Sequence, residues 1–147
     1  MNTLYLDTNI FLNIILKEND FYESSSKLMQ SIELNEYLAI TSFLTIMEVH
    51  RVLQKQNKTL QEIENIIENI QQLKIKIIIP ESTDIISAYE LLKLYNLNPP
   101  DAIHIAIALE NANYFITRDE TLLKKERIKS VLEIQKPDKL KYLNNYE

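Results

Sequence analysis

Residues 101–119 read DAIHIAIALENANYFITRD, and this stretch says most about the fold. Its first part, residues 101–112, is apolar on nearly every side, as is typical of a helix buried in the interior. The segment 114–116 has the β-forming side chains of a short strand, and Thr117 and Asp119 come just after it. The stretch therefore predicts an interior helix that leads into a strand, with an acidic residue where the strand ends.

Alternating helix and strand patterns continue through the rest of the chain. The other predicted elements are strands at residues 3–6, 37–41, 74–79 and 131–134, and helices at residues 9–17, 20–34, 42–56, 60–73 and 83–95. Strands that alternate with helices form parallel sheets with both faces covered. We therefore expect an α/β fold, a three-layer sandwich with a central parallel sheet of about five strands flanked by helices, in a single domain over residues 1–147.

Composition excludes several kinds of protein. The chain has 147 residues, a formal net charge of −5, no cysteine and no glycine. Without cysteine there are no disulfides, zinc–thiolate sites or cysteine nucleophiles, and without glycine there is no glycine-rich phosphate loop. Turns that need positive φ must use other residues, of which asparagine tolerates this conformation best. The negative charge argues against broad electrostatic binding of nucleic acid, but it allows a local basic strip.

The sequence shows no pattern for insertion into a membrane or export across one. No segment has the length and apolarity of a membrane span. The N-terminal residues lack the basic region and long apolar stretch of a secretory signal. We therefore expect a cytoplasmic protein without a membrane partner.

Three aspartates fall where a functional site or a helix cap would form. Asp7 follows the first predicted strand and Asp119 follows the fourth, and sites of parallel sheets lie outside the carboxyl ends of the strands. The alternative for Asp7 and Asp119 is that each is the N-cap of the helix that follows it. The alternative for Asp101 is that its negative charge is stabilised by the helix dipole, because it lies in a first helical turn. His104, one turn beyond Asp101, would orient a carboxylate, touch the substrate or sit as a hydrogen-bonded, half-buried histidine.

Glu48 lies on a face of its predicted helix that is otherwise apolar. Leu44 and Val52 share that face, one turn before and one turn after Glu48. A glutamate there costs free energy unless it pairs, for example with Arg51, or binds a metal. Four carboxylates that converge without a metal would repel one another and raise one another's pKa. Magnesium or manganese relieves this repulsion because both ions prefer oxygen ligands, and such sites serve metal-assisted phosphodiester hydrolysis.

Four short motifs follow one another along the chain. They are LYLDTN at residues 4–9, the stretch from Thr41 to Glu48 at the end of the second predicted strand and on the helix after it, PDAIHIA at residues 100–106 and FITRD at residues 115–119. In this order the set resembles the PIN-domain nucleases, with their three successive acids and their threonine-x-aspartate motif. The single-domain layout is similar to that of VapC-type toxins of type II toxin–antitoxin systems. The family often has a glycine before the fourth strand, where residues 110–113 read ENAN, and asparagine can adopt the same conformation.

The resemblance implies a PIN-like fold and a magnesium- or manganese-dependent endoribonuclease, the toxin of a toxin–antitoxin pair. It also implies an RNA substrate (tRNA, rRNA or mRNA), a cognate antitoxin protein and a homodimer. The acids would be the catalytic metal ligands, and two neutral residues would support them by holding a water or phosphate and by fixing the last acidic loop. The implied metal ligands are Asp7, Glu48, Asp101 and Asp119, and the implied supporting residues are Asn9 and Thr117.

A cluster of basic residues follows the fourth acid. It would give an acidic protein a local rim for binding RNA phosphates, and the alternative is a solvated helix face. The residues are Arg118, Lys124, Lys125, Arg127 and Lys129.

Other functions stay open at this point. Within the family, the alternatives are a housekeeping RNA-processing nuclease and a non-catalytic PIN-like module that binds RNA or protein. Outside it, aspartyl-phosphate phosphatases and receiver domains also begin with a strand that ends in aspartate. The phosphatase pattern needs a second aspartate where this chain has Asn9, and a receiver needs an acidic phosphate acceptor after its third strand, where Pro80 stands.

Overall fold

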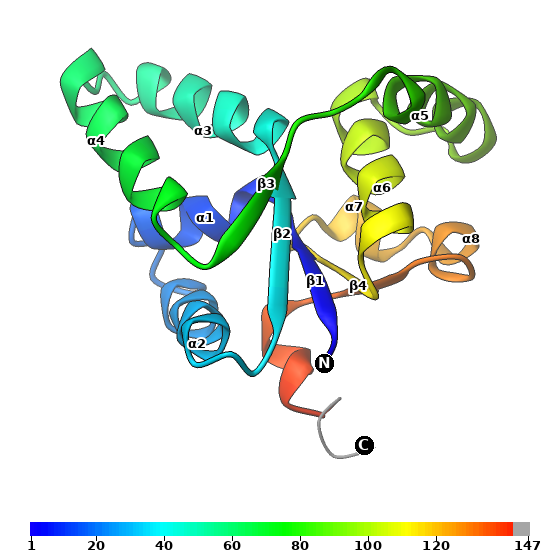
Figure 1. Ribbon diagram of the computed structural model, residues 1–147, viewed down its shortest axis with the longest axis horizontal. Coiled ribbons are helices and arrows are strands. Elements are labelled where there is room, and N and C mark those ends of the chain that lie inside the picture. Colours follow the sequence, from blue (N-terminus) through cyan, green and yellow to red (C-terminus); the bar gives the residue numbers. More distant parts are fainter. Residues whose placement is uncertain (143–147) are drawn as a thin grey trace.

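Five parallel strands form the central sheet within residues 1–142, the part of the chain that the structure describes, without the side chains of residues 141 and 142. The structure is a computed structural model (Figure 1). The strands lie in the order β3-β2-β1-β4-β5, and every neighbouring pair is parallel. This confirms the expected α/β sandwich. The strands are β1 (Thr3–Leu6), β2 (Leu38–Ser42), β3 (Ile75–Ile78), β4 (Tyr114–Ile116) and β5 (Glu133–Gln135).

Helices cover both faces of the sheet, as Figure 1 shows. On one face lie α1 (Thr8–Ile15), α2 (Tyr22–Glu33), α3 (Phe43–Lys55) and α4 (Leu60–Gln71), and on the other lie α5 (Ser82–Tyr95), α6 (Pro99–Asn111), α7 (Glu120–Leu123) and α8 (Glu126–Lys129). The 3-10 helix η1 (Pro137–Tyr142) packs against α2. Among the helices of residues 1–142, none combines the length and apolarity needed to cross a bilayer.

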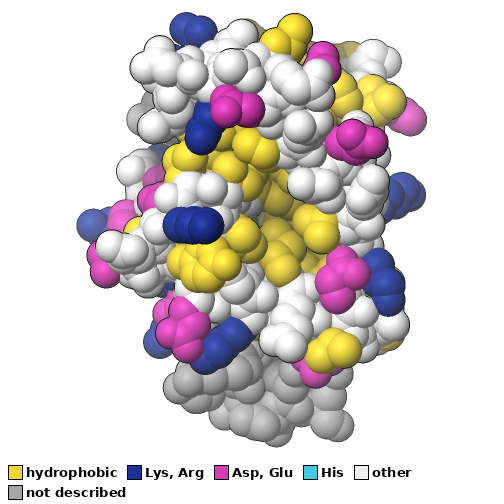
Figure 2. All heavy atoms as spheres, turned by 90° about the vertical axis from the view of Figure 1, so that its left-hand side faces the viewer, with side chains coloured by type: hydrophobic (Ala, Val, Ile, Leu, Met, Phe, Trp, Pro, Cys, Tyr) yellow, Lys and Arg dark blue, Asp and Glu magenta, His cyan; other side chains and the backbone are white. Residues whose placement is uncertain are grey.

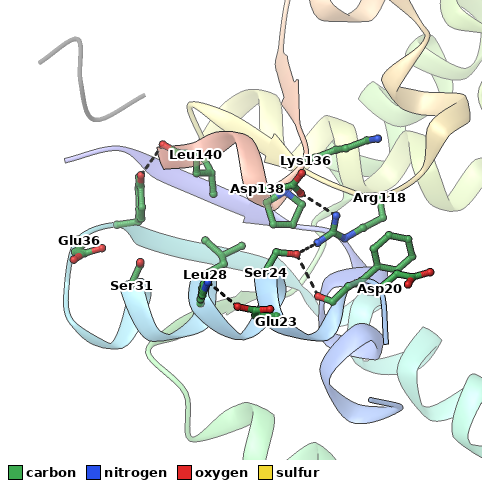
Figure 3. A pocket seen from close by; sticks show the side chains of 14 residues that line it. Asp20, Glu23, Ser24, Leu28, Ser31, Glu36, Arg118, Lys136, Asp138 and Leu140 are labelled. Carbon is green, nitrogen blue, oxygen red and sulfur yellow. Dashed lines mark hydrogen bonds and ion pairs between the residues drawn. The ribbon is translucent and has the colours of Figure 1, made fainter. Parts of the chain in front are cut away.

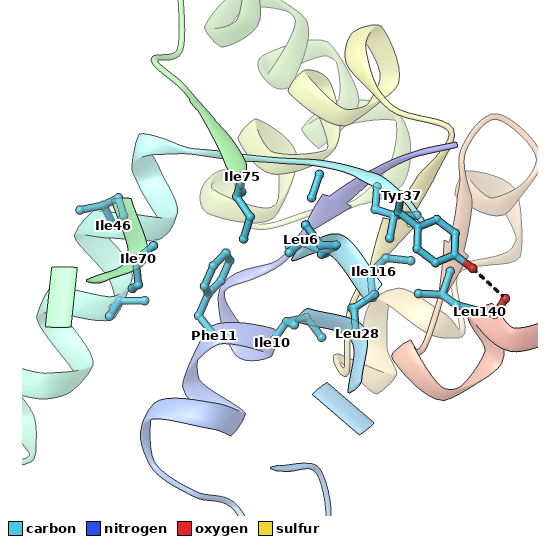
Figure 4. Close-up of a cluster of buried hydrophobic side chains, with 14 of the residues drawn as sticks. Leu6, Ile10, Phe11, Leu28, Tyr37, Ile46, Ile70, Ile75, Ile116 and Leu140 are labelled. Atoms are coloured by element: carbon cyan, nitrogen blue, oxygen red, sulfur yellow. Dashed lines mark hydrogen bonds between the residues drawn. The ribbon is translucent and has the colours of Figure 1, made fainter. Parts of the chain in front are cut away.

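Strand alternation sends side chains into two separate cores. In β1, Leu4 and Leu6 enter the core under α1 to α4, whereas Tyr5 enters the core under α5 to α8. All three side chains are fully buried. Figure 4 shows the first core, in which Phe11 of α1 and Ile75 of β3 belong to the same cluster as Leu6. Because both faces of the sheet are covered, β1 is apolar on both of its sides.

The last strand begins later than the sequence predicts. The predicted strand covers residues 131–134, whereas β5 begins at Glu133. The backbone N–H groups of Val131 and Leu132 donate to Ile128 O, at 2.9 and 3.0 Å. They extend the turn of α8, a helix that the sequence did not predict, and are therefore not available to the sheet. The predicted start of this strand is wrong for that reason.

Asparagine takes most of the left-handed backbone positions, as the composition predicts. Within residues 1–142, positive φ occurs at Lys17, Asn35, Asn57 and Asn96. The turn before β4 does not use this conformation, because Ala112 leaves α6 with a φ of −134°. Asn113 there accepts a hydrogen bond from the Thr3 backbone N–H at 2.8 Å, which ties the turn to β1.

The strand order places a topological switch point between β1 and β4. The chain adds β2 and β3 on one side of β1 and then places β4 and β5 on the other. Open parallel sheets bind ligands at such a point, outside the carboxyl ends of the strands. Asp7 follows β1, and Thr117 and Asp119 follow β4. The topology therefore brings the first and fourth predicted acids to the same end of neighbouring strands.

Candidate active site

Both the backbone and the side chain of Asp7, at the end of β1, are hydrogen-bonded. Its backbone N–H donates to Ile116 O of β4 at 3.0 Å, which continues the strand pairing. The residue is 6% exposed. Its carboxylate accepts hydrogen bonds from the Thr8 backbone N–H (2.8 Å, to Oδ1) and from the Thr117 hydroxyl (2.7 Å, to Oδ2). Asp7 is thus both the N-cap of α1 and a buried carboxyl group at the switch point.

Thr117 links the acids that follow β1 and β4. Its hydroxyl donates to Asp7 and accepts from the Asp119 backbone N–H at 3.0 Å. Asn9 Nδ2 donates to the same hydroxyl oxygen at 3.1 Å. Asp119 caps α7 by accepting from the Thr121 backbone N–H at 2.8 Å. This geometry suits the supporting roles of Asn9 and Thr117, which stay predictions.

Asp101 shares the electrostatic environment of two other acids. It lies in the first turn of α6, where the Asn98 side chain is the N-cap and accepts from the Asp101 backbone N–H at 3.0 Å. Burial, and then the negative charges of Asp7 and Asp119, raise the pKa of Asp101 to about 6. Burial also raises the pKa of Asp7, against the opposing effect of His104. Asp7 and Asp119 are therefore close enough to Asp101 for their charges to disfavour its ionised form.

Glu48 reaches this group from α3. Its Oε1 accepts from the Thr8 hydroxyl at 2.9 Å and from His104 Nε2 at 2.5 Å. Burial acts to raise the pKa of Glu48, but the hydrogen bonds and the nearby histidine outweigh it and hold the pKa below its ordinary value. The alternative ion pair with Arg51 is not among those formed within residues 1–142.

His104 connects the acids to the interior. It is 1% exposed, with Nδ1 2.5 Å from the Tyr5 hydroxyl oxygen and Nε2 3.9 Å from Asp7 Oδ1. Burial opposes a positive charge on the ring, but the Glu48 hydrogen bond and the nearby carboxylates outweigh it and raise the pKa of His104. His104 is therefore hydrogen-bonded as expected, but it is fully buried rather than half-buried because α6 packs it between β1 and α3. Its contact with Glu48 suits a role in orienting a carboxylate, which stays a prediction. The available signal was its place one turn beyond Asp101 on an apolar helix.

Two further residues of the site were missed by the sequence analysis. The Thr8 hydroxyl donates a hydrogen bond to Glu48, and the Tyr5 hydroxyl is hydrogen-bonded to His104 Nδ1. In the sequence, Tyr5 is one residue of an apolar strand and Thr8 is one residue of a helix start, so neither carries a local signal. Their roles depend on partners that are distant along the chain.

The donor set suits a hard divalent cation. Asp7, Asp101 and Asp119 offer carboxylate oxygens whose mutual repulsion a cation would relieve, and magnesium and manganese prefer such ligands. As they stand, no three histidine, aspartate or glutamate side chains of residues 1–142 form a group that could hold one metal ion. The ligand roles of these three acids and of Glu48 therefore stay predictions that rest on donor chemistry and charge.

The Arg118 side chain contacts residues of α2 and η1, and Figure 3 shows its interactions with Ser24 and Asp138. Its Nε donates to Asn13 Oδ1 at 3.2 Å, and Nη1 pairs with Asp138 at 2.9 Å. Nη2 donates to the Ser24 hydroxyl, and the guanidinium lies 4.5 Å from the centre of the Phe21 ring. The side chain is 10% exposed and lines a groove of about 650 Å³ between α2 and η1. These contacts give Arg118 a structural role, and its predicted RNA contact stays a prediction.

Two of the remaining predicted RNA-binding residues, Lys125 and Arg127, lie near the end of α5. Lys125 Nζ donates to the carbonyl oxygens of Tyr95 and Asn96, at 3.4 and 3.5 Å. The Arg127 guanidinium lies 5.5 Å from the centre of the Tyr95 ring. Lys124 and Arg127 are exposed, so they are free to meet a polyanion. Their contact with RNA also stays a prediction.

Comparison with known proteins gives one family and several similar folds. The sequence matches the family model of the PIN domain over residues 4–128. No curated protein matches the sequence. Among solved structures, VapBC2 from Rickettsia felis bound to a DNA fragment from its promoter has a TM-score of 0.69 and 21% identity, over 91% of this chain and 98% of that chain.

Two other solved structures have the same fold. VapBC-1 from nontypeable Haemophilus influenzae has a TM-score of 0.67 and 18% identity, over 92% of this chain and 98% of that one. A toxin–antitoxin complex from Klebsiella pneumoniae has a TM-score of 0.63 and 21% identity, over 91% of this chain and 97% of that one. At these identities the likeness shows the fold, and it agrees with the match to the family model.

Proposed function

The chain belongs to the PIN domain family, and we propose that it is a magnesium- or manganese-dependent endoribonuclease, the toxin of a toxin–antitoxin pair. The observation that carries the proposal is that Asp7 and Asp119 follow neighbouring strands at one edge of the sheet, with Asp101 at the start of α6 close enough to be affected by their charges. The charges of Asp7 and Asp119 raise the pKa of Asp101. Neighbouring carboxylates of this kind destabilise the metal-free protein because their charges repel one another. A bound cation would remove this repulsion, so the arrangement is what we expect of a cation site.

Bound at these acids, a divalent cation would activate water and stabilise the charge on a phosphate. The chain supplies a fixed set of oxygens, because Thr8 and Thr117 hold the two oxygens of Asp7 in place. Groups that are already oriented need no reorganisation during the reaction. In the proposed hydrolysis, the oxygen of water bonds to phosphorus and the bond from phosphorus to O3′ breaks. The products carry a 5′-phosphate and a 3′-hydroxyl, and the RNA 2′-hydroxyl takes no part.

Removing divalent metal should abolish RNA cleavage. We expect discrete fragments from a total RNA pool with manganese and none after addition of EDTA, because the acids alone cannot offset the charge on the phosphate. The measurement is gel analysis of the fragments with mapping of their ends. Fragments that end in 2′,3′-cyclic phosphates would contradict the mechanism, and RNA binding without cleavage would favour the non-catalytic module.

An antitoxin partner is proposed from the neighbouring structures and from one surface. Figure 2 shows hydrophobic side chains gathered in a hollow on the side of the molecule where α1, α2 and α4 lie. Partly buried hydrophobic residues of these helices include Ile15, Met29, Ile66 and Ile67. Apolar surface that stays partly exposed is typical of interaction sites, and an amphipathic antitoxin segment would cover it. The homodimer stays a prediction.

Expression of the chain alone in a bacterial host should stop growth. The toxin proposal predicts this result because RNA cleavage without an antitoxin would halt protein synthesis, and Asp101→Asn should restore growth. Growth is followed by optical density, with equal amounts of the two proteins confirmed on a gel. Normal growth with an active wild-type enzyme would favour the housekeeping nuclease.

A further inference from the structure

A row of hydrogen-bonded side chains runs from the second core to the acids. Tyr5 of β1, His104 of α6 and Glu48 of α3 follow one another, with 2.5 Å at each of the two contacts. Tyr5 is fully buried and His104 is 1% exposed. The row therefore links three elements that meet at the switch point of the sheet.

The chemistry of the groups fixes the direction of the second contact. An ionised carboxylate can only accept hydrogen bonds, so His104 Nε2 must carry a proton and donate to Glu48. In a neutral ring, Nδ1 is then an acceptor, and the Tyr5 hydroxyl is placed to donate to it. A hydrogen bond to one ring nitrogen sets which proton the other carries. Glu48 thus sets which ring nitrogen carries the proton, and the Tyr5 hydroxyl satisfies the other nitrogen and anchors the ring.

Both hydrogen bonds of Glu48 fall on the same oxygen. Oε1 accepts from His104 Nε2 and from the Thr8 hydroxyl, while Oε2 takes no hydrogen bond from the described residues. The ring nitrogen that contacts Glu48 also lies 3.9 Å from Asp7 Oδ1. His104 thus stands between two predicted metal ligands and leaves one oxygen of Glu48 available.

Packing alone does not explain a histidine at this position. Its buried neighbours on α6 are apolar, among them Ala102, Ile105 and Ala106. An apolar side chain would fill the same space without needing two polar partners, and it would often be at least as stable. A buried polar residue that is fully hydrogen-bonded instead serves to fix the geometry of its partners.

We propose that His104, anchored by Tyr5, is a positioning residue that holds Glu48 with Oε1 bound to the protein and Oε2 free for a divalent cation. The inference rests on the proposed function, since it assigns a task to Glu48 at that site. Residues behind metal ligands set the orientation of the ligand and its affinity for the metal.

Manganese affinity of the RNA-free protein tests the proposal. His104→Leu removes the donor, and we expect it to weaken manganese binding about 10- to 100-fold in titration calorimetry. Tyr5→Phe removes only the hydroxyl and keeps the ring stacked on Phe115, so a smaller loss is expected. His104→Gln should recover most of the affinity, because its amide nitrogen can donate to Glu48 in place of Nε2.

Tyr37→Phe is the matched control for loss of a buried hydroxyl. Tyr37 is 4% exposed, and its hydroxyl donates to Leu140 O, away from the acids. This variant should bind manganese as the wild type does. Thermal unfolding in EDTA checks that each variant folds, and Tyr5→Phe keeps the test valid if His104→Leu does not.

A second readout examines the metal-free protein. Nitrogen NMR of histidine should show a proton on His104 Nε2, and a ring protonated on Nδ1 alone would overturn the proposal. Wild-type manganese affinity in both His104→Leu and Tyr5→Phe would overturn it as well. A wild-type protein that binds no manganese would instead overturn the proposed function, so the two failures are distinguishable.

Discussion

Replacing Asp101 with asparagine is expected to lower the rate of RNA cleavage more than about 100-fold, because changes even to residues behind metal ligands cost 10- to 100-fold. The variant should also unfold at a higher temperature than the wild type in EDTA. The reason is that Asp101 is partly buried beside the charges of Asp7 and Asp119, which oppose its own. Initial rates with manganese and thermal unfolding without it provide the two measurements.

Glu110→Gln is the matched control for this prediction. Glu110 lies on the same helix, α6, and is exposed. The same change of charge there should leave both the rate and the unfolding temperature close to the wild-type values. If Asp101→Asn cleaved RNA at the wild-type rate, Asp101 would not be a metal ligand. If it unfolded at a lower temperature, the loss of activity would reflect a damaged fold.

Phe115→Ala should destabilise the protein by about 3–5 kcal/mol, the usual range for removal of a fully buried aromatic side chain. Phe115 is fully buried in β4 and stacks on Tyr5, with 5.3 Å between ring centres and an interplanar angle of 9°. The change leaves a cavity and removes the ring on which Tyr5 stacks, and Tyr5 is the residue that contacts His104. Urea unfolding followed by circular dichroism gives the free energy of unfolding.

Phe43→Ala provides the comparison for this loss. Phe43 is 41% exposed at the start of α3, and its replacement should change the free energy of unfolding by no more than about 0.5 kcal/mol. Phe115→Leu serves as the milder variant if the alanine variant is unfolded. A loss below 1 kcal/mol for Phe115→Ala would contradict the packing described for this core.

The sequence determined most of the elements, though not α8 or the start of β5, because the signals of a helix or strand are local. Ser42 was predicted to begin a helix, and its hydroxyl accepts from the Leu44 backbone N–H two residues on. Pro99 stands in the first turn of α6, where its missing N–H costs nothing. Alternation of strands and helices then predicted the covered parallel sheet, and the end of each strand indicated where Asp7 and Asp119 would lie. These inferences need only neighbours along the chain or the general geometry of parallel sheets.

Tertiary structure alone decided the contacts among the site residues. Glu48 was expected either to pair with Arg51 on its own helix or to bind metal, yet its hydrogen-bond partner His104 is 56 residues away. The Tyr5 and His104 side chains are 99 residues apart in the sequence. Spacing along a helix or strand says nothing about such pairs, because they form only when β1, α3 and α6 pack together. The sequence therefore determined which chemical groups reach the site, and the packing of these elements determined which of them hold one another.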